Sequence, residues 1–274
     1  MTNPLLEIRN LEVTYHGKKL DKQGFKALKG VSLDIRPGEV VGLVGESGCG
    51  KTTLGRAILG LAPVTSGEII FEGKNISHAN RSERKEIAKH LQVVFQDPYT
   101  SLNPSMSIEQ ILAEPLFVQG IDKISAKRRV KELLDAVALP ANAGQRRARE
   151  FSGGQRQRIA IARALALSPK LIICDEPVSA LDLSTSARVL ELFLEIQERT
   201  GVAYLFISHD LAVVRHVSHR VAVMYSGEIV EWGDSDQVTA RPQHEYSRKL
   251  MMSAPVPHPR LQAERRKQRL ALLG

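Results

Sequence analysis

The chain of 274 residues has little cysteine and no long apolar run. Its two cysteines, Cys49 and Cys174, lack metal-ligand spacing, and we expect no disulfide because cytosolic thiols stay reduced. The apolar runs are short and interrupted, which argues against a membrane-spanning helix. The first ten residues, MTNPLLEIRN, lack the charged and apolar regions of a signal peptide. These absences predict a protein that is cytosolic or attached to a membrane through its partners.

Aromatic residues are also scarce, at 5% of the chain, although the formal net charge is +8. A basic chain invites a nucleic-acid interpretation. The positive residues are dispersed, however, and the denser groups at 127–131, 146–149 and 265–269 have no aromatic residues interleaved with them. We therefore expect solvated surface rather than a nucleic-acid interface, with some attraction to anions or lipid surfaces.

One stretch, Val41–Thr53 (VGLVGESGCGKTT), reads as an apolar strand, a glycine-rich turn and the start of a helix. It fits the phosphate-loop spacing G-x-x-x-x-G-K-[ST] at every fixed position. Glycines let backbone N–H groups wrap a phosphate chain, and the helix start adds unpaired N–H groups and positive dipole charge. A plain glycine-rich turn is the alternative, which the flanking strand and helix disfavour. The predicted ATP-binding residues are Gly45, Glu46, Ser47, Gly48, Cys49, Gly50, Lys51, Thr52 and Thr53.

Two of these side chains have predicted roles of their own. Lys51 should reach the β- and γ-phosphates, and the Thr52 hydroxyl should ligate Mg²⁺.

Polar residues end three later apolar strands. Leu91–Gln96 (LQVVFQ) ends in Gln96, which can touch Mg²⁺ or the attacking water, and Leu171–Glu176 (LIICDE) ends in two carboxylates. Asp175 should hold Mg²⁺ through water. Glu176 should accept a proton from the attacking water or orient it.

The third of these strands, Val202–His209 (VAYLFISH), ends in His209. A strand-end histidine is often an ordinary hydrogen-bonded surface residue. Here it shares the predicted sheet edge with Lys51, Gln96 and Asp175, where ligands bind in doubly wound sheets, which favours a contact with the γ-phosphate.

A second glycine pair opens another helix. The segment from Tyr99 to about Glu150 is mostly helical by period, and FSGGQ at 151–155 follows it. Ser152 is a candidate N-cap, and Gly153 and Gly154 create a second anion-binding helix terminus. One ATP does not need two such termini from one chain, so the pattern indicates a dimer. Asp182 follows at a turn, where it could cap the next helix or contact a partner.

The N-terminal region alternates apolar and polar residues. Leu5–Tyr15, Ala27–Ile35 and Glu68–Phe71 predict short strands of a small antiparallel sheet. Tyr15 either stacks on a purine or is an ordinary strand-end aromatic residue, and the sequence leaves both open. After the last core strand, 221–225 and 228–232 predict a hairpin and 237–240 and 244–253 predict helices. A proline-containing, basic tail follows at 258–274.

One ordered set of residues and motifs is now complete: Tyr15, the phosphate loop, Gln96, FSGGQ, the Asp-Glu pair, Asp182 and His209. This set resembles the ATP-binding subunit of ABC transporters. The resemblance extends from about Leu5 to Trp232. FSGGQ is the decisive motif, with Phe in place of the commoner Leu. The resemblance implies an α/β, P-loop NTPase-type fold: a mostly parallel sheet, an antiparallel β subdomain and a helical subdomain. The implied domain limits are 1–254 for the nucleotide-binding domain, about 97–157 for its helical subdomain and about 233–257 for a C-terminal extension.

The resemblance also implies a head-to-tail dimer that sandwiches ATP and Mg²⁺. Ser152, Gly153, Gly154, Gln155 and Asp182 would contact ATP held by the partner. The implied catalytic residues are Lys51, Gln96, Glu176 and His209. The implied Mg²⁺ ligands are Thr52, Gln96 and, through water, Asp175. Tyr15 would join the ATP site.

Three further segments resemble the dipeptide/oligopeptide/nickel importer branch: VFQDPYTSLNP at 94–104, AEPL at 113–116 and HEYSRKLMMSAPVP at 244–257. The branch implies peptide uptake, with nickel or another small solute as the alternative. It also implies a second, non-identical ATPase, two permease subunits, an extracytoplasmic binding protein and a peripheral position on the cytoplasmic face of the membrane. No iron–sulfur cluster is expected, since no cysteine follows Cys174.

Three other functions are alternatives to transport. One is a bare nucleotide-binding module without turnover, which the presence of Glu176 and His209 disfavours. A DNA-repair or chromosome ATPase would insert a long coiled coil between the phosphate loop and FSGGQ, where this chain has only about a hundred residues without sustained heptads. A soluble, non-transport ABC ATPase usually carries two cassettes in one chain, whereas this chain has one.

Overall fold

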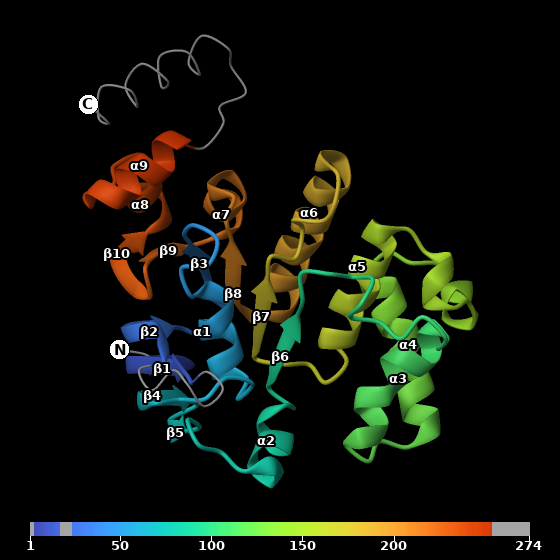
Figure 1. Cartoon of the computed structure of the whole chain (residues 1–274). Helices are drawn as coiled ribbons and strands as arrows, with labels where there is room; N and C mark the ends of the chain where they lie inside the picture. Colours follow the sequence, from blue (N-terminus) through green and yellow to red (C-terminus); the bar gives the residue numbers. More distant parts are fainter. Residues whose placement is uncertain (1–2, 17–23, 254–274) are drawn as a thin grey trace.

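Two β-sheets and a group of helices form the fold of the computed structural model, which describes residues 3–16 and 24–253 (Figure 1). The larger sheet has the strand order β10–β9–β3–β8–β7–β6. Its strands are β3 (Val40–Val44), β6 (Leu91–Val94), β7 (Leu171–Asp175), β8 (Ala203–Ser208), β9 (Arg220–Tyr225) and β10 (Glu228–Asp234). All neighbours pair in parallel except β9 and β10. The continuous burial of β3 and β8 is typical of parallel strands covered on both faces.

The smaller sheet is antiparallel and has the order β2–β1–β4–β5. Its strands are β1 (Leu6–Tyr15), β2 (Phe25–Ile35), β4 (Ser66–Phe71) and β5 (Lys74–Asn75). Leu6 lies opposite Ile35 on one side and Phe71 on the other, and all three side chains are buried. The alternation in the N-terminal segments thus predicted this sheet correctly.

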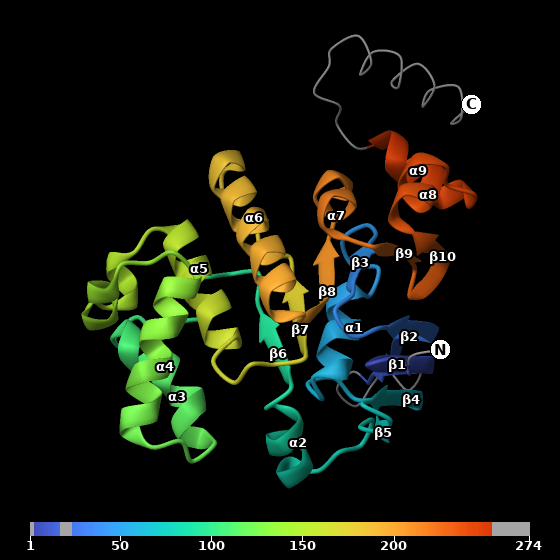
Figure 2. The same ribbon diagram turned by 180° about the vertical axis from the view of Figure 1, so that it is seen from behind.

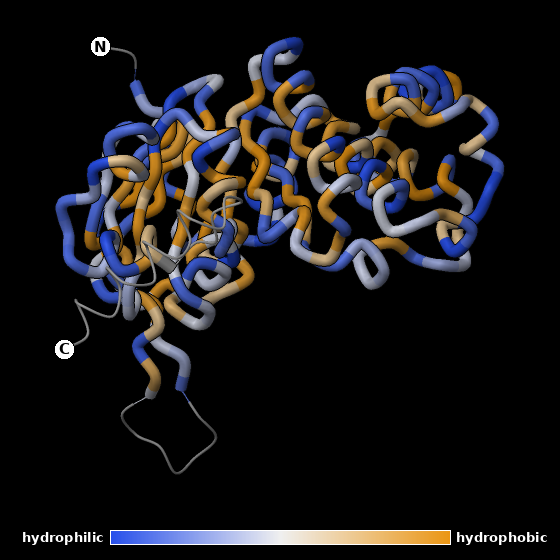
Figure 3. Tube along the Cα trace, turned by 90° about the horizontal axis from the view of Figure 1, so that it is seen from above, coloured by the Kyte–Doolittle hydropathy of each residue, from blue (hydrophilic) through white to orange (hydrophobic). Residues whose placement is uncertain are grey.

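The larger sheet separates two hydrophobic cores because successive side chains of a strand point to opposite faces. On one face, Leu43 and Ile173 pack with helix α1 (Lys51–Ile58) and the antiparallel sheet. On the other face, Cys174 and Phe206 pack with α6 (Leu183–Thr200) and α7 (Leu211–Val217). Seen from above, hydrophobic residues concentrate in the interior of the molecule (Figure 3).

The remaining helices form two groups at opposite ends of the larger sheet (Figures 1 and 2). One group lies beyond β6 and consists of α3 (Ile108–Val118), α4 (Lys123–Ala136), the 3₁₀ turns η1 (Ala141–Gln145) and η2 (Ala148–Glu150), and α5 (Gly153–Ala164). The other lies beside β10 and consists of α8 (Ser235–Ala240) and α9 (Glu245–Ser253). A short helix α2 (Arg81–Ile87) connects the sheets.

The α/β fold class with its parallel sheet, antiparallel sheet and helical lobe agrees with the expectation from the sequence. The expected lobe limit near residue 157 falls inside α5. The expected basic tail, 258–274, lies outside the described residues. Among residues 3–16 and 24–253, none of the helices has both the length and the hydropathy that a membrane crossing requires.

One arginine ties the antiparallel sheet to the end of the larger sheet. The Arg220 guanidinium on β9 donates to Glu39 at 2.6 and 2.8 Å and to the carboxylate of Asp34 on β2 at 2.7 and 3.2 Å. The same group lies 4.4 Å from the ring centroid of Trp232 on β10. The side chain is only 16% exposed, and both carboxylates raise the pKa of Arg220, so this is a charge cluster largely removed from water.

We expect Arg220→Ala to lower the free energy of unfolding by about 2–4 kcal/mol, because it leaves the carboxylate of Glu39 buried beside no cation. Urea unfolding followed by circular dichroism measures the change. The exposed pair between Arg215 and Asp236 is the control: Arg215→Ala should change the same free energy by less than about 1 kcal/mol. Equal effects of the two substitutions would contradict a structural role for the cluster.

Candidate functional site

The loop between β3 and α1 is shaped by glycines that no other residue could replace without strain. Gly50 precedes α1 with φ +114°, a left-handed conformation that side chains disfavour. A Cβ atom on Gly45 would lie 2.2 Å from the carbonyl oxygen of Met224 in β9. The backbone of the loop therefore lies directly against the backbone of β9.

Lys51 opens α1 and places its ammonium group inside this loop. The side chain is 5% exposed, and Nζ donates to the carbonyl oxygens of Gly45 at 2.7 Å and Glu46 at 2.8 Å. No acidic residue lies in the first turn of α1. A helix start without acidic side chains, next to a buried cation, favours the binding of an anion.

Two predicted metal ligands meet at the end of β7. The Thr52 hydroxyl donates to Oδ1 of Asp175 at 3.1 Å. Burial raises the pKa of Asp175, and the nearby Glu176 raises it further, while the bond from Thr52 opposes both. Hydroxyl and carboxylate oxygens are the ligands that Mg²⁺ prefers, so these two residues fit the expected ion, which would also offset the charge of a poorly solvated carboxylate.

Three strand ends converge on the carboxylate of Glu176. Its Oε2 accepts a hydrogen bond from Gln96 Nε2 at 3.2 Å and lies 3.2 Å from Nδ1 of His209. Gln96 follows β6, Glu176 follows β7 and His209 follows β8, because the carboxyl ends of neighbouring parallel strands share one edge.

The backbone of Glu176 is strained. Its φ of +48° lies in the left-handed region, and its N–H donates to the carbonyl oxygen of Ile207 at 2.9 Å. This conformation is uncommon for a non-glycine residue, and the bond to Ile207 fixes it where β7 ends.

The FSGGQ segment lies elsewhere, at the start of α5 in the helical lobe, away from α1 (Figures 1 and 2). Ser152 caps the helix: its hydroxyl accepts from the N–H of Gln155 at 3.4 Å, and the Gln155 side chain accepts from the N–H of Ser152 at 3.1 Å. Both residues are exposed. A Cβ atom on Gly154 would lie 2.2 Å from Thr185, so α5 and α6 touch here.

Asp182 caps α6 next to this contact. Its carboxylate accepts from the N–H of Thr185 at 2.9 Å and from the hydroxyl groups of Thr185 and Ser184, both at 2.7 Å. These bonds lower the pKa of Asp182 well below its usual range. The structure therefore brings Asp182 close to the FSGGQ helix.

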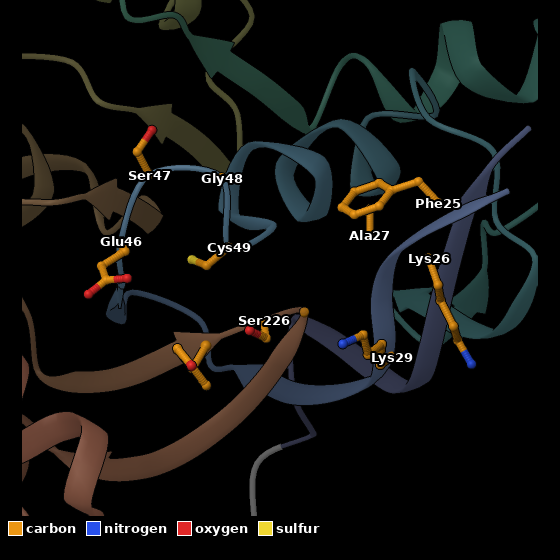
Figure 4. Close-up of a pocket in the computed structure, with 11 residues that line it drawn as sticks. Phe25, Lys26, Ala27, Lys29, Glu46, Ser47, Gly48, Cys49 and Ser226 are labelled. Carbon is orange, nitrogen blue, oxygen red and sulfur yellow. The ribbon is translucent and has the colours of Figure 1, made fainter. Parts of the chain in front are cut away.

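A cavity of about 310 Å³ adjoins the phosphate loop (Figure 4). It is lined by β2, by the loop and by the β9–β10 turn, through Phe25, Lys26, Ala27, Lys29, Glu46, Ser47, Gly48, Cys49, Tyr225, Ser226 and Gly227. The aromatic residue that the antiparallel sheet contributes is Phe25. Tyr15, its cross-strand partner, is not among the lining residues.

The sequence interpretation missed the aromatic lining residues Phe25 and Tyr225. Phe25 opens the strand opposite Tyr15, so the pairing of two strand-end aromatic residues was the available signal.

The cysteine of the loop, Cys49, is buried, and burial raises the pKa of its thiol, so it stays protonated at neutral pH.

Comparisons with known proteins agree with this geometry. The family model described as ABC transporter matches residues 28–179. The chain is 48% identical to a putative peptide import ATP-binding protein of Brucella ovis, covering 96% of this chain and 82% of that protein. It is 46% identical to the oligopeptide transport ATP-binding protein OppF of Bacillus subtilis, covering 98% and 88%, and 49% identical to the dipeptide transport ATP-binding protein DppF of Lactococcus lactis, covering 94% and 84%.

Solved structures give the same result. The cbiO1 protein of Clostridium perfringens, part of the ABC transporter complex cbiONQ, superposes with a TM-score of 0.78 at 28% identity, covering 87% of this chain and 92% of that one. The ATP-binding cassette MJ0796, a dimer in a post-hydrolysis state bound to ADP and Pi, superposes with a TM-score of 0.74 at 29% identity, covering 84% and 98%.

The burial of Asp175 generates a stability prediction. A raised pKa means that the folded state holds this proton more tightly than the unfolded state, so the group costs stability as the pH rises through its folded pKa. We expect Asp175→Asn to unfold at higher urea concentration than the wild type at pH 8 without Mg²⁺, with the difference shrinking as the pH falls.

The matched control is Asp236→Asn, because that carboxylate is 86% exposed. It should leave the urea midpoint unchanged at every pH. A wild-type midpoint for Asp175→Asn at pH 8 would contradict the proposed cost of burying this charge.

Proposed function

The chain belongs to the ABC transporter family, and on that premise we propose that it is the ATP-hydrolysing subunit of an importer that takes up di- or oligopeptides. The observation that carries the enzymatic part is the carboxylate of Glu176, which Gln96 and His209 both contact beside the phosphate loop. The relatives named for peptide, oligopeptide and dipeptide transport support the cargo.

We assign the chemistry to residues of this edge. Lys51 and the loop Gly45–Thr53, through the backbone N–H groups that do not donate within the protein, would bind the phosphates. Thr52 and Gln96, and Asp175 through water, would hold Mg²⁺, which would supply positive charge to neutralise the phosphates. Glu176 accepts a proton from the attacking water or orients it, and His209 contacts the γ-phosphate.

We place a second ATPase subunit opposite this one in a head-to-tail arrangement. The FSGGQ helix terminus lies in the lobe beyond β6, on another element than the phosphate loop of the same chain, and Asp182 caps α6 where α6 touches this helix. A partner's loop would bring ATP to Ser152, Gly153, Gly154 and Gln155. The γ-phosphate then bridges both subunits, and its hydrolysis releases the bridge.

We assign the remaining partners from the family. Two permease subunits would carry the peptide through the membrane, an extracytoplasmic binding protein would deliver it, and this chain would sit on the cytoplasmic face. Nickel or another small solute remains the alternative cargo.

Glu176→Gln should slow ATP hydrolysis by the assembled complex about 100- to 10,000-fold while nucleotide binding persists, because it removes the proton acceptor and keeps the shape. A phosphate-release assay and a titration with a fluorescent ATP analogue measure the two effects. Lys51→Ala is the contrasting variant and should weaken the binding itself. Unchanged turnover in Glu176→Gln would refute the role of this carboxylate.

An affinity purification of the tagged chain from detergent-solubilised native membranes tests the transport role. We expect two permeases and a second ATPase to co-purify, identified by mass spectrometry, and the associated binding protein to bind peptides rather than Ni²⁺. Co-purified proteins that include no permease would refute the proposed role in import and favour a non-transport ATPase.

A further inference from the structure

The C-terminal extension touches the phosphate loop through one hydroxyl group. Tyr246 lies in the first turn of α9, and its hydroxyl oxygen accepts a hydrogen bond from the backbone N–H of Glu46 at 3.0 Å. Glu46 is the second residue of the loop, 200 positions earlier in the chain. The phosphate-binding motif does not explain this contact, since Tyr246 lies outside it.

Both backbone groups of Glu46, its N–H and its C=O, are hydrogen-bonded within the protein. The carbonyl oxygen of Glu46 accepts from Lys51 Nζ at 2.8 Å and from the N–H of Cys49 at 3.3 Å. Tyr246 holds the N–H of the same residue. Lys51 Nζ donates to the carbonyl oxygens of Gly45 and Glu46. The hydroxyl of Tyr246 binds the N–H group that lies between these two carbonyl groups, so it helps to orient them.

Helix α9 is itself fixed to the sheet. The carboxylate of Glu231 on β10 accepts from the N–H groups of Gln243 at 2.7 Å and His244 at 3.1 Å, just before the helix begins. Ser247 in the next position of α9 is fully buried. These hydrogen bonds attach the start of α9 to β10.

The ring of Tyr246 completes the connection. It lies 4.3 Å from the ring of Tyr225, centroid to centroid, and Tyr225 lines the cavity next to the loop. Beside it, the N–H of Gly227 in the β9–β10 turn donates to the carbonyl oxygen of Cys49 at 2.9 Å. The hairpin and α9 therefore hold the loop at two separate backbone positions, Glu46 and Cys49.

We propose that Tyr246 is a positioning residue for nucleotide binding, through which the C-terminal extension fixes the phosphate loop in its binding shape. Displacement of α9 from the hairpin then weakens the affinity for ATP, so the extension controls the site from outside the phosphate-binding motif. This inference rests on the proposed binding of ATP by the loop.

The chemistry of the phenol suits this role. Burial raises the pKa of Tyr246, so the hydroxyl stays neutral at physiological pH. A neutral acceptor orients the N–H of Glu46 without adding negative charge beside a loop that receives phosphates.

The test compares Tyr246→Phe with Ser247→Ala in the full chain. The first removes the hydroxyl and keeps the ring against Tyr225. The second removes a neighbouring hydroxyl of the same helix, for which the described part of the chain offers no hydrogen-bond partner. Thermal unfolding establishes that both variants fold.

Hydrogen exchange of the nucleotide-free protein is the first measurement. Tyr246→Phe should speed exchange in the peptide that contains Glu46, with no change in peptides of α3 and α4, and Ser247→Ala should match the wild type. Titration with a fluorescent ATP analogue is the second, with an expected loss of affinity of about three- to tenfold for Tyr246→Phe, the size of one lost hydrogen bond.

In the assembled complex, Tyr246→Phe should raise the KM for ATP by the same factor and leave kcat within about twofold. Wild-type exchange and affinity in this variant would overturn the inference, as would equal losses in both variants. A wild-type chain that binds no nucleotide would instead refute the proposed function, and hydrogen exchange would still decide whether Tyr246 orders the loop.

Discussion

Lys51 carries a full positive charge at a position that is 5% exposed, and its ammonium group donates to two carbonyl oxygens of its own loop. A buried cation needs such partners because desolvation is costly. The glycines of the loop allow its carbonyls to turn towards Lys51, while the packing of Gly45 against β9 and of α1 against the sheet keeps them there.

The carboxylates balance that cation at a cost to stability. Asp175 is buried enough for its pKa to be raised, and Glu176 holds a left-handed backbone conformation. A folded core optimised for stability alone would avoid both features. Both features occur at the carboxyl end of β7, next to Thr52, where a metal ion would offset the charge of Asp175.

The sequence predicts the placement of residues that lie in one contiguous motif or at the ends of neighbouring parallel strands. The phosphate loop is a contiguous motif, and the meeting of Gln96, Glu176 and His209 follows from the rule that parallel strands share a carboxyl edge. Sequence reasoning could not find the bond from Glu46 to Tyr246 or the pairing of Arg220 with Asp34, because these residues are 200 and 186 positions apart and no periodicity links them. Such contacts depend on how the C-terminal hairpin docks onto the two sheets, which no local pattern encodes.

The helical lobe is joined to the hydrolytic edge through the segment that follows Gln96. At one end of this segment, Gln96 donates to Glu176. At the other, the guanidinium of Arg156 in α5 lies 4.5 Å from the ring centroid of Tyr99, and Arg163 of the same helix donates to the carbonyl oxygen of Ser101 at 2.7 Å. The helix that begins with FSGGQ is therefore bonded to the same short segment whose first residue, Gln96, donates to Glu176. In the proposed head-to-tail dimer, these few residues would connect the carboxylate of one ATP site with the helix terminus that contacts the other ATP.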